Sequence, residues 1–221
     1  MTAGSSREAI MTATFTALSE HGYADITIQA IADEFEKSKS LILYHYDSKD
    51  ALMTAFMEWI LEEFLDRVEG DQSDDPATRL RRMARLVIGV DEANGTDAFH
   101  TALLELRAQA PYNEALRAQL VENDRRIRER IAADVREGIE RGQFRPVDPE
   151  SFAAAFRSAI EGAESHAVIL GDDAPNETAL AGIDERFIQD LLRADVEEHG
   201  DDGVGGPPVE SDATRAAGES T

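Results

Sequence analysis

Apolar residues recur at helical spacing along nearly the whole chain of 221 residues. Such spacing places them on one face of an α-helix, whereas a half-buried strand needs strict alternation. No segment alternates for long, and the turn pair Asn94-Gly95 has no strand-like flanks. We therefore predict an all-α protein of about nine helices. The longest is marked by Leu116, Leu120, Ile127, Ile131, Val135 and Ile139.

Capping residues and helix breakers divide this pattern. Ser, Thr, Asp and Asn favour the N-cap, proline the first turn, and glycine the position after the last turn. We expect helices at residues 6–20, 28–35, 39–44, 48–69, 76–90, 97–110, 116–141, 149–170 and 176–198. The expected caps are Thr27, Ser38, Asp148 and Asn176, and the expected ends are Gly22 and Gly142. The fourth helix should bury Leu52, Phe56, Trp59 or Ile60, and Phe64.

The composition is strongly acidic and lacks cysteine. The chain has 45 Asp and Glu against 22 Lys and Arg, a net charge of −23, and only three of its basic residues are Lys. This balance resembles that of proteins from salt-in halophiles, with an ordinary acidic protein as the alternative. The absence of Cys excludes disulfides and thiolate metal sites. The charge repels nucleic acid at low salt, but molar salt confines that repulsion to contact distance.

No targeting or membrane segment is expected. Residues 1–6 are small and polar, without the basic and apolar regions of a signal peptide. No apolar stretch approaches the ~20 residues that a membrane span needs. These features predict a soluble, cytoplasmic protein without a membrane partner.

Residues 24–50 carry the sharpest functional signal. Two short helices, each preceded by an N-cap, are separated by a few polar residues, as in a helix-turn-helix. Ile28, Ile31, Phe35 and Ile42 can lock this pair against the first helix. The outer face of the second short helix then remains free to enter a DNA groove.

The same segment resembles the N-terminal DNA-binding domain of TetR-type (tetracycline-repressor-like) regulators. The matching runs are HGY at 21–23, TIQAIA at 27–32, SKS at 38–40, YHY at 44–46 and SKDAL at 48–52. The resemblance covers residues 7–55 well. It extends weakly to residues 142–149 and 160–162, which are similar to the ligand-binding domains of the superfamily. It implies a helix-turn-helix domain at 1–50, hereafter the headpiece, and a helical ligand-binding and dimerisation domain at 51–199. Residues 200–221 are predicted to form a disordered acidic tail.

The headpiece is the expected DNA-binding surface. All three lysines lie within residues 37–49, where a compact ammonium group can meet a phosphate, although solvated lysines clustered by chance are the alternative. The expected DNA contacts are Thr27, Gln29, Lys37, Ser38, Lys39, Ser40, Tyr44, His45 and Lys49. Tyr46 is expected in the core. The headpiece has four basic against eight acidic side chains, so few counterions would be released and the salt dependence of binding should be shallow.

The C-terminal part is expected to hold a second site. The resemblance implies that its last two long helices pair with those of a second copy, with ordinary intramolecular packing as the alternative. The candidates for a small-molecule pocket are residue types that serve more often in a core than in ligand contacts: Phe56, Trp59, Phe99, His100, Leu103, Tyr112, Phe156 and His166. No cofactor and no metal site are expected, and the effector, if there is one, is not identified.

Enzyme motifs are missing from the sequence. It has no glycine-rich phosphate loop, no HExxH and no GxSxG, and no two His lie three or four residues apart. We therefore expect a regulator and not an enzyme. It would bind a palindromic operator on double-stranded DNA as a homodimer and act as a ligand-responsive repressor. The alternative is a helical dimer with a degenerate headpiece that acts only through protein contacts.

Overall fold

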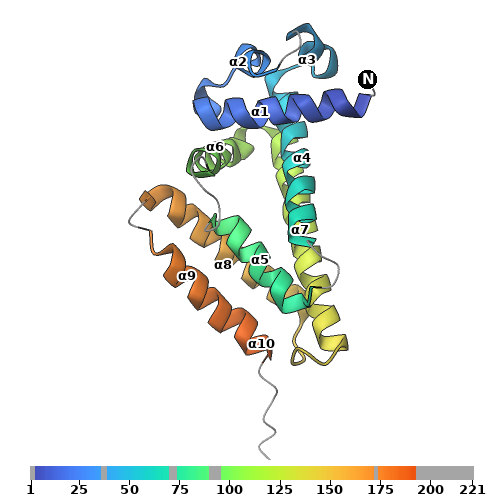
Figure 1. Ribbon diagram of the computed structural model, residues 1–221, viewed down its shortest axis with the longest axis vertical. Coiled ribbons are helices and arrows are strands. Elements are labelled where there is room, and N and C mark those ends of the chain that lie inside the picture. The colour runs from blue at the N-terminus through green and yellow to red at the C-terminus, as the bar shows by residue number, and fades with distance from the viewer. Residues whose placement is uncertain (1–2, 36–38, 70–73, 90–95, 172–173, 193–221) are drawn as a thin grey trace, which may run out of the picture.

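The computed structural model describes residues 3–35, 39–69, 74–89, 96–171 and 174–192, and every regular element within these ranges is helical. The elements are α1 (Ala3–Asp25), α2 (Ile28–Asp33), α3 (Lys39–His45), α4 (Lys49–Glu69), α5 (Pro76–Ile88), α6 (Thr96–Ala108), η1 (Ala110–Tyr112), α7 (Glu114–Glu140), α8 (Pro149–Leu170), α9 (Asn176–Ile183), η3 (Asp184–Gln189) and α10 (Asp190–Leu192). They form an elongated molecule with α1, α2 and α3 at one end (Figure 1). The all-α prediction is confirmed for these residues.

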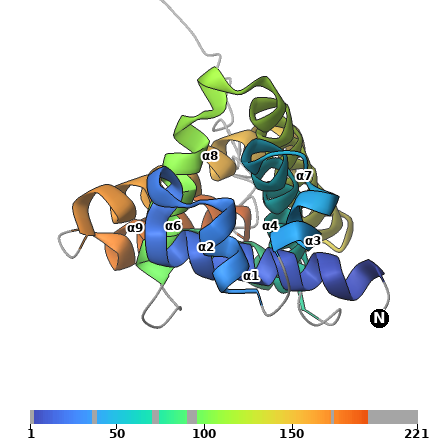
Figure 2. The ribbon, with the colours of Figure 1, turned by 90° about the horizontal axis from the view of Figure 1, so that it is seen from above.

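The first buried cluster holds the headpiece together. Ile10 and Leu18 of α1, Ile31 of α2 and Ile42 of α3 are all fully buried in it. The same cluster continues into α6 and the start of α7 through Phe99, Ala102, Leu103, Leu106 and Leu116. Helix α1 packs chiefly against α6, which crosses beneath it (Figure 2). The helix-turn-helix therefore stands on α6 as well as on α4.

The second buried cluster fills the rest of the molecule, hereafter the body. It joins α5, α7, α8, α9 and η3 with the lower half of α4. Phe152 and Phe156 of α8 stack with ring centroids 5.7 Å apart, and Phe187 of η3 meets both rings edge-on. Helices α4 and α7 run side by side and connect this cluster to the headpiece (Figure 1).

Most of the predicted helix ends are confirmed. Thr27 and Asp148 accept hydrogen bonds from the backbone N–H groups of their first turns. Gly142 adopts a φ of 68° just after α7, and Gly22 adopts a φ of 70° within the bounds of α1, where it kinks the helix three residues before its end; a side chain would be strained at both positions. Asn176 was wrong as a cap, because it is the first residue of α9 and Pro175 precedes it without a side-chain cap. Ser38 and residues 193–198 lie outside the described residues.

The inward face of α4 differs from the prediction. Leu52 and Phe56 are buried as expected, together with Met53, Met57 and Leu61. Trp59, Ile60 and Phe64 are only half-buried, because they pack against the edges of the buried clusters and also line a cavity. The division expected at residue 50 falls at the start of α4, and residues 200–221 lie outside the described residues. No described helix combines the length and apolarity needed to cross a bilayer.

Candidate DNA-binding surface and ligand cavity

Helix α3 presents a polar face to solvent at one end of the molecule. Its single buried residue is Ile42, whereas Lys39, Ser40, Tyr44 and His45 are exposed, Tyr44 by 82%. The ring of His45 stands edge-on to that of Tyr44, with centroids 5.3 Å apart. One buried anchor on a seven-residue helix leaves the remaining side chains available to a partner.

Other expected contacts are already bonded within the chain. The Gln29 side chain donates a hydrogen bond to Asp33 at 2.7 Å, and exposed Thr27 caps α2. Lys49 donates to the carbonyl oxygen of Tyr23 at 3.0 Å, and its Nζ lies 4.5 Å from the centre of that ring. Burial lowers the pKa of Lys49. Tyr46 is half-buried against the headpiece cluster, whereas Lys37 and Ser38 lie outside the described residues.

The corner at Gly22 and Tyr23, near the end of α1, connects the headpiece to α6. The backbone N–H of Tyr23 donates to the Glu105 carboxylate at 2.8 Å. A Cβ at Gly22 would lie 3.2 Å from the same carboxylate, so this close approach suits glycine. Since Lys49 of α4 holds the Tyr23 carbonyl, one residue connects α6, α1 and α4. A displacement of α6 would therefore act directly on the headpiece.

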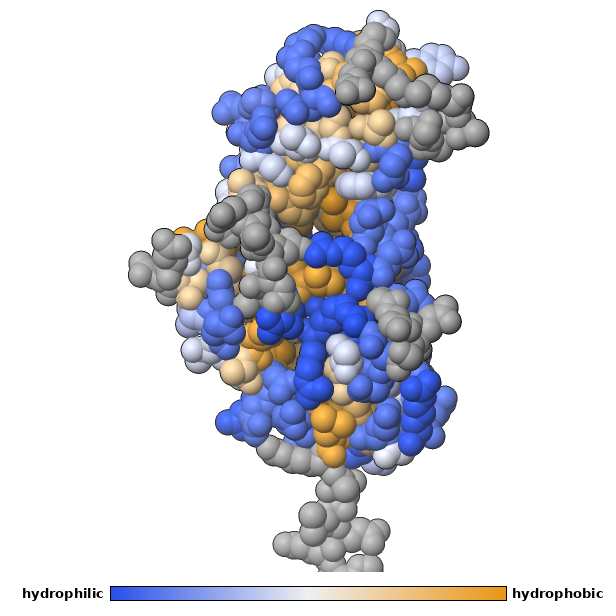
Figure 3. Space-filling model, viewed as in Figure 1, coloured by the Kyte–Doolittle hydropathy of each residue, from blue (hydrophilic) through white to orange (hydrophobic). Residues whose placement is uncertain are grey.

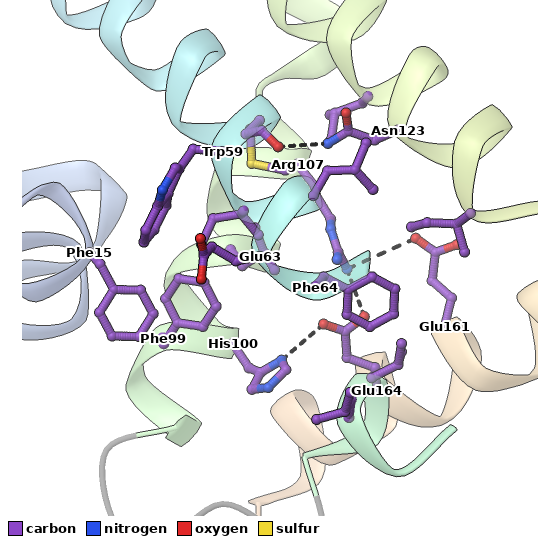
Figure 4. A pocket seen from close by; sticks show the side chains of 18 of the residues that line it. Phe15, Trp59, Glu63, Phe64, Phe99, His100, Arg107, Asn123, Glu161 and Glu164 are labelled. Atoms are coloured by element: carbon purple, nitrogen blue, oxygen red, sulfur yellow. Dashed lines mark hydrogen bonds and ion pairs between the residues drawn. The ribbon is translucent and has the colours of Figure 1, made fainter. Parts of the chain in front are cut away.

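A cavity of about 1010 Å³ lies between the headpiece and the body, walled by α1, α4, α5, α6, α7 and α8. The surface is hollowed at this place (Figure 3). The rings of Phe15, Trp59 and Phe99 gather at one side, with the Glu63 carboxylate near them (Figure 4). Phe15 and Phe99 stack with centroids 4.5 Å apart. This end can receive an apolar or aromatic group.

The other side of the cavity is polar. His100 and Arg107 of α6 converge on Glu164 of α8, with distances of 3.0 Å and 2.7 Å to its two carboxylate oxygens (Figure 4). Burial alone would raise the pKa of Glu164, but the hydrogen bond from His100 and the charge of Arg107 outweigh burial and lower it. Glu164 is therefore held as a carboxylate at neutral pH. Asn123 of α7 donates to the Met57 carbonyl of α4 at 2.9 Å and closes the wall between these helices.

The structure brings some of the expected pocket residues together and separates others. Trp59, Phe99, His100 and Leu103 line the cavity. Phe56 and Phe156 are fully buried in the two apolar clusters. Tyr112 is 87% exposed on η1, and His166 is exposed on α8. None of these last four side chains lines the cavity.

Sequence reasoning missed the charged side chains of the cavity, Arg107, Arg157 and Glu164. The available signal was the spacing of Arg157, Glu161 and Glu164 on one helix face. That face also carries Ala153 and Ile160, which are fully buried. No group of three or more possible metal ligands comes together in the described part of the chain.

Two family models match the chain. The model for the N-terminal region of bacterial regulatory proteins of the tetR family matches residues 10–56. The model for the C-terminal region of BetI-type transcriptional repressors matches residues 76–193, which is more than half of the chain. The chain therefore belongs to the TetR family of transcriptional regulators, as the headpiece motifs predicted.

Individual relatives agree with this assignment. A TetR transcription regulator from Haloarcula marismortui ATCC 43049 is 38% identical, with a TM-score of 0.75, over 86% of this chain and 100% of that one. The regulator BetI of Stenotrophomonas maltophilia (strain R551-3) is 33% identical over 93 residues, 41% of this chain and 47% of that protein. A regulator from Saccharomonospora viridis, solved with choline, shares the fold at 19% identity, with a TM-score of 0.72, over 86% of this chain and all of that one.

Proposed function

We propose that the chain represses transcription by binding a palindromic operator as a homodimer and that a small molecule in the cavity releases it. The observation that carries the proposal is the exposed face of α3, on which Lys39, Ser40, Tyr44 and His45 stand together. Lysine and hydroxyl groups on one short helix suit phosphates and base edges in a major groove. The protein would act in the cytoplasm, where the DNA lies, by binding and not by catalysis.

The exposed face of α8 supports a dimer. Ser151, Ala155, Ser158 and Gly162 follow one another along this face, all exposed and uncharged. Ile169 is 68% exposed near its end. A long uncharged face is unusual on a chain with a net charge of −23, and its small residues allow a second helix to approach closely. Pairing there would place two α3 helices for successive major grooves, about 34 Å apart or somewhat more.

The position of α6 supports ligand control. Its Leu103 and Arg107 face the cavity, whereas Glu105 holds the corner of the headpiece at Tyr23. A ligand that binds one position of α6 more tightly would shift the population of headpiece separations, and operator affinity would change with it. The choline complex of a protein with the same fold makes a cation one candidate effector.

The charge pattern supports function in concentrated salt. With −23 overall and few lysines, affinity would rest on hydrogen bonds and apolar contacts more than on counterion release. Operator binding should then change little between low and high salt. A steep loss of affinity with salt would contradict this part of the proposal.

The test is a fluorescence-anisotropy titration of the full chain with DNA from upstream of its own gene and with an unrelated duplex. It is run at about 0.2 M and about 2 M potassium chloride. Lys39→Ala should weaken specific binding roughly tenfold, and Tyr44→Phe should weaken it if the hydroxyl meets the DNA. Arg136→Met is the control, because Arg136 pairs with Glu150 on the body.

The outcomes separate the candidates. Specific binding that weakens with Lys39→Ala supports the repressor. If no upstream fragment binds, a selection from genomic fragments follows, because the operator need not lie at its own promoter. Failure of that selection at both salt concentrations would overturn the proposal in favour of a dimer that acts through protein contacts.

A further inference from the structure

Arg157 is a buried cation with unused hydrogen-bond donors. It lies on α8 in the wall of the cavity and is only 7% exposed. Its Nε and Nη1 are covered by neighbouring atoms and have no hydrogen-bond partner. A buried donor without an acceptor loses its hydration and gains nothing in return, and the loss is larger for a charged group. Such a group in a native protein calls for a missing partner.

The nearest carboxylates do not satisfy Arg157. Glu161 approaches Nη2 at 3.4 Å and Asp124 approaches Nε at 3.7 Å, both longer than a charge-assisted hydrogen bond. Asp124 is engaged with Arg128 at 2.7 Å. Glu161 is shared with Arg107, which lies 3.9 Å away. Both acids are 41% exposed, so their charges are partly solvated and their side chains can move aside.

The polar side of the cavity therefore holds two guanidinium groups, buried Arg157 and half-buried Arg107, against one buried carboxylate. Arg107 and Arg157 lie close enough to repel each other, and Glu164 is the one fully buried carboxylate among the described residues that line the cavity. Arg107 and His100 already occupy both of its oxygens. Burial lowers the pKa of Arg157, and the charge of Arg107 acts in the same direction. One more acceptor, buried beside Arg157, would satisfy the donors that Arg157 leaves unused.

We propose that the cavity binds a small carboxylic acid with an apolar or aromatic body, and that Arg157, beside Arg107, receives its carboxylate. The assignment rests on the proposed effector role of the cavity and names the chemical class of the effector. The carboxylate takes the place that the Glu161 side chain holds between the two guanidinium groups, and Arg157 turns its planar fork toward it. The body of the ligand lies toward Phe15, Trp59 and Phe99.

A purely cationic ligand fits this cluster poorly. It would meet Arg107 and Arg157 at the polar side, where like charges in a buried site repel strongly. The free carboxylates that could attract it, Glu20 and Glu63, are exposed and therefore solvated. The unsatisfied group of the cavity is a donor, so an acceptor is the missing partner.

The test compares probes that differ in charge. These are 3-phenylpropionate and octanoate, their neutral amides, and choline. Trp59 is the only tryptophan of the chain and lines the cavity, so its fluorescence reports binding without DNA. Thermal unfolding gives a second readout. We expect at least one acid to bind roughly tenfold or more tightly than its own amide.

Two variants locate the contact. Arg157→Met keeps the length of the side chain and should weaken acid binding roughly ten- to a hundredfold while amide binding stays unchanged. Arg136→Met removes a surface arginine paired with Glu150 and should change neither. Circular dichroism checks that both variants fold. The assignment is overturned if choline binds and neither acid does, if acid and amide bind equally, or if Arg157→Met leaves acid affinity intact.

The DNA titration described above distinguishes a failure of the carboxylate assignment from a failure of the repressor proposal. If choline and not an acid releases the operator, the repressor stands and the carboxylate assignment falls. If acids bind through Arg157 but the chain binds no operator, the assignment of the site stands and its role as an effector site falls.

Discussion

Two arginines of the body are equally buried but differ in their hydrogen bonds. Arg79 on α5 is 5% exposed and Arg157 on α8 is 7% exposed. Arg79 donates to Asp134 at 2.7 Å, to the Asp74 carbonyl at 2.6 Å and to Glu137. Arg157 leaves two donors unused. Burial alone therefore does not distinguish a structural ion pair from a binding site, whereas the satisfaction of donors does.

Arg79 and Arg157 also differ in where they lie in the fold. Arg79 connects α5, α7 and the segment before α5, and Arg130 adds a second cation to Asp134 at 3.3 Å. Arg157 faces a cavity with space for a guest. A charge network that is already complete stabilises the fold, while an incomplete one at a cavity is stabilised by what binds there.

The largest expected effect is on Arg79. Arg79→Met leaves Asp134 buried with one weaker partner, so the free energy of unfolding should fall by about 3–5 kcal/mol. Urea unfolding followed by circular dichroism measures the change. Arg136→Met, which removes a half-exposed pair, is the matched control.

A double variant sharpens this prediction. Arg79→Met with Asp134→Leu removes both buried charges and should recover much of the loss, because the unpaired carboxylate is then gone. A double variant as unstable as Arg79→Met alone would mean that packing of the arginine, and not its charge, holds α5 to α7.

The opposite sign is expected for Arg157. In the ligand-free protein Arg157→Met removes a buried charge with unsatisfied donors, and the free energy of unfolding should rise by about 1–3 kcal/mol. Asp124 and Glu161 remain partly solvated, and Asp124 keeps Arg128. Urea unfolding without added ligand measures the gain. A loss of stability comparable to that of Arg79→Met would erase the distinction between the two arginines.

The sequence predicted the headpiece better than the cavity, and the reason is physical. The caps at Thr27 and Asp148 and the burial of Ile31 and Ile42 follow from neighbours a few residues away, so local rules predict them. The cavity depends on how α1, α4, α5, α6, α7 and α8 pack, which no local rule describes.

The charged residues illustrate the limit most clearly. With 67 charged side chains in the chain, Arg157 and Glu164 look like members of a solvated face. Only the contact of α8 with α6 and α7 shows that they are buried. Phe156 and Tyr112 show the same limit for aromatic residues. Phe156 lies in the core and Tyr112 on the surface, and the residue type alone does not distinguish the two places.

Arg145 tests how much an ion pair contributes to stability when it is only partly buried, and the expected effect is smaller. It donates to the Asp190 carbonyl at 3.0 Å and also to the Asp190 carboxylate, while its side chain is 32% exposed. Arg145→Met should lower the free energy of unfolding by about 1 kcal/mol, because solvent screens the ion pair but the hydrogen bond to the Asp190 carbonyl is lost too. Arg125→Met, which removes half-exposed pairs with Glu122 and Glu129 along one helix, should cause no measurable change. An Arg145 effect as large as that of Arg79 would show that pairing matters more than burial.

The smallest effect concerns the pH dependence of Glu164, the satisfied acid beside the unsatisfied arginine. Its folded pKa is lowered, chiefly by His100 and Arg107 against the opposing effect of burial, from an ordinary value of 4.5. Its ionised form therefore stabilises the protein above that value, and this contribution is lost as pH falls through the lower folded pKa. Arg157, from the same helix, is a further charged neighbour of Glu164.

Glu164→Gln cannot ionise, so the difference in unfolding free energy from the unsubstituted protein should narrow as the pH falls from about 5 through the lowered folded pKa of Glu164. Urea unfolding at fixed salt across this range measures it. Glu161→Gln is the matched control on the same helix, because the Glu161 carboxylate lies 3.9 Å from Arg107 and 3.4 Å from Arg157, farther than the 2.7 Å between Glu164 and Arg107. A Glu164→Gln difference that widens as the pH falls would mean that the acid is held protonated. In that case the polar side of the cavity would carry still more uncompensated positive charge, and the need for an anionic guest would be greater than the ion pairs indicate.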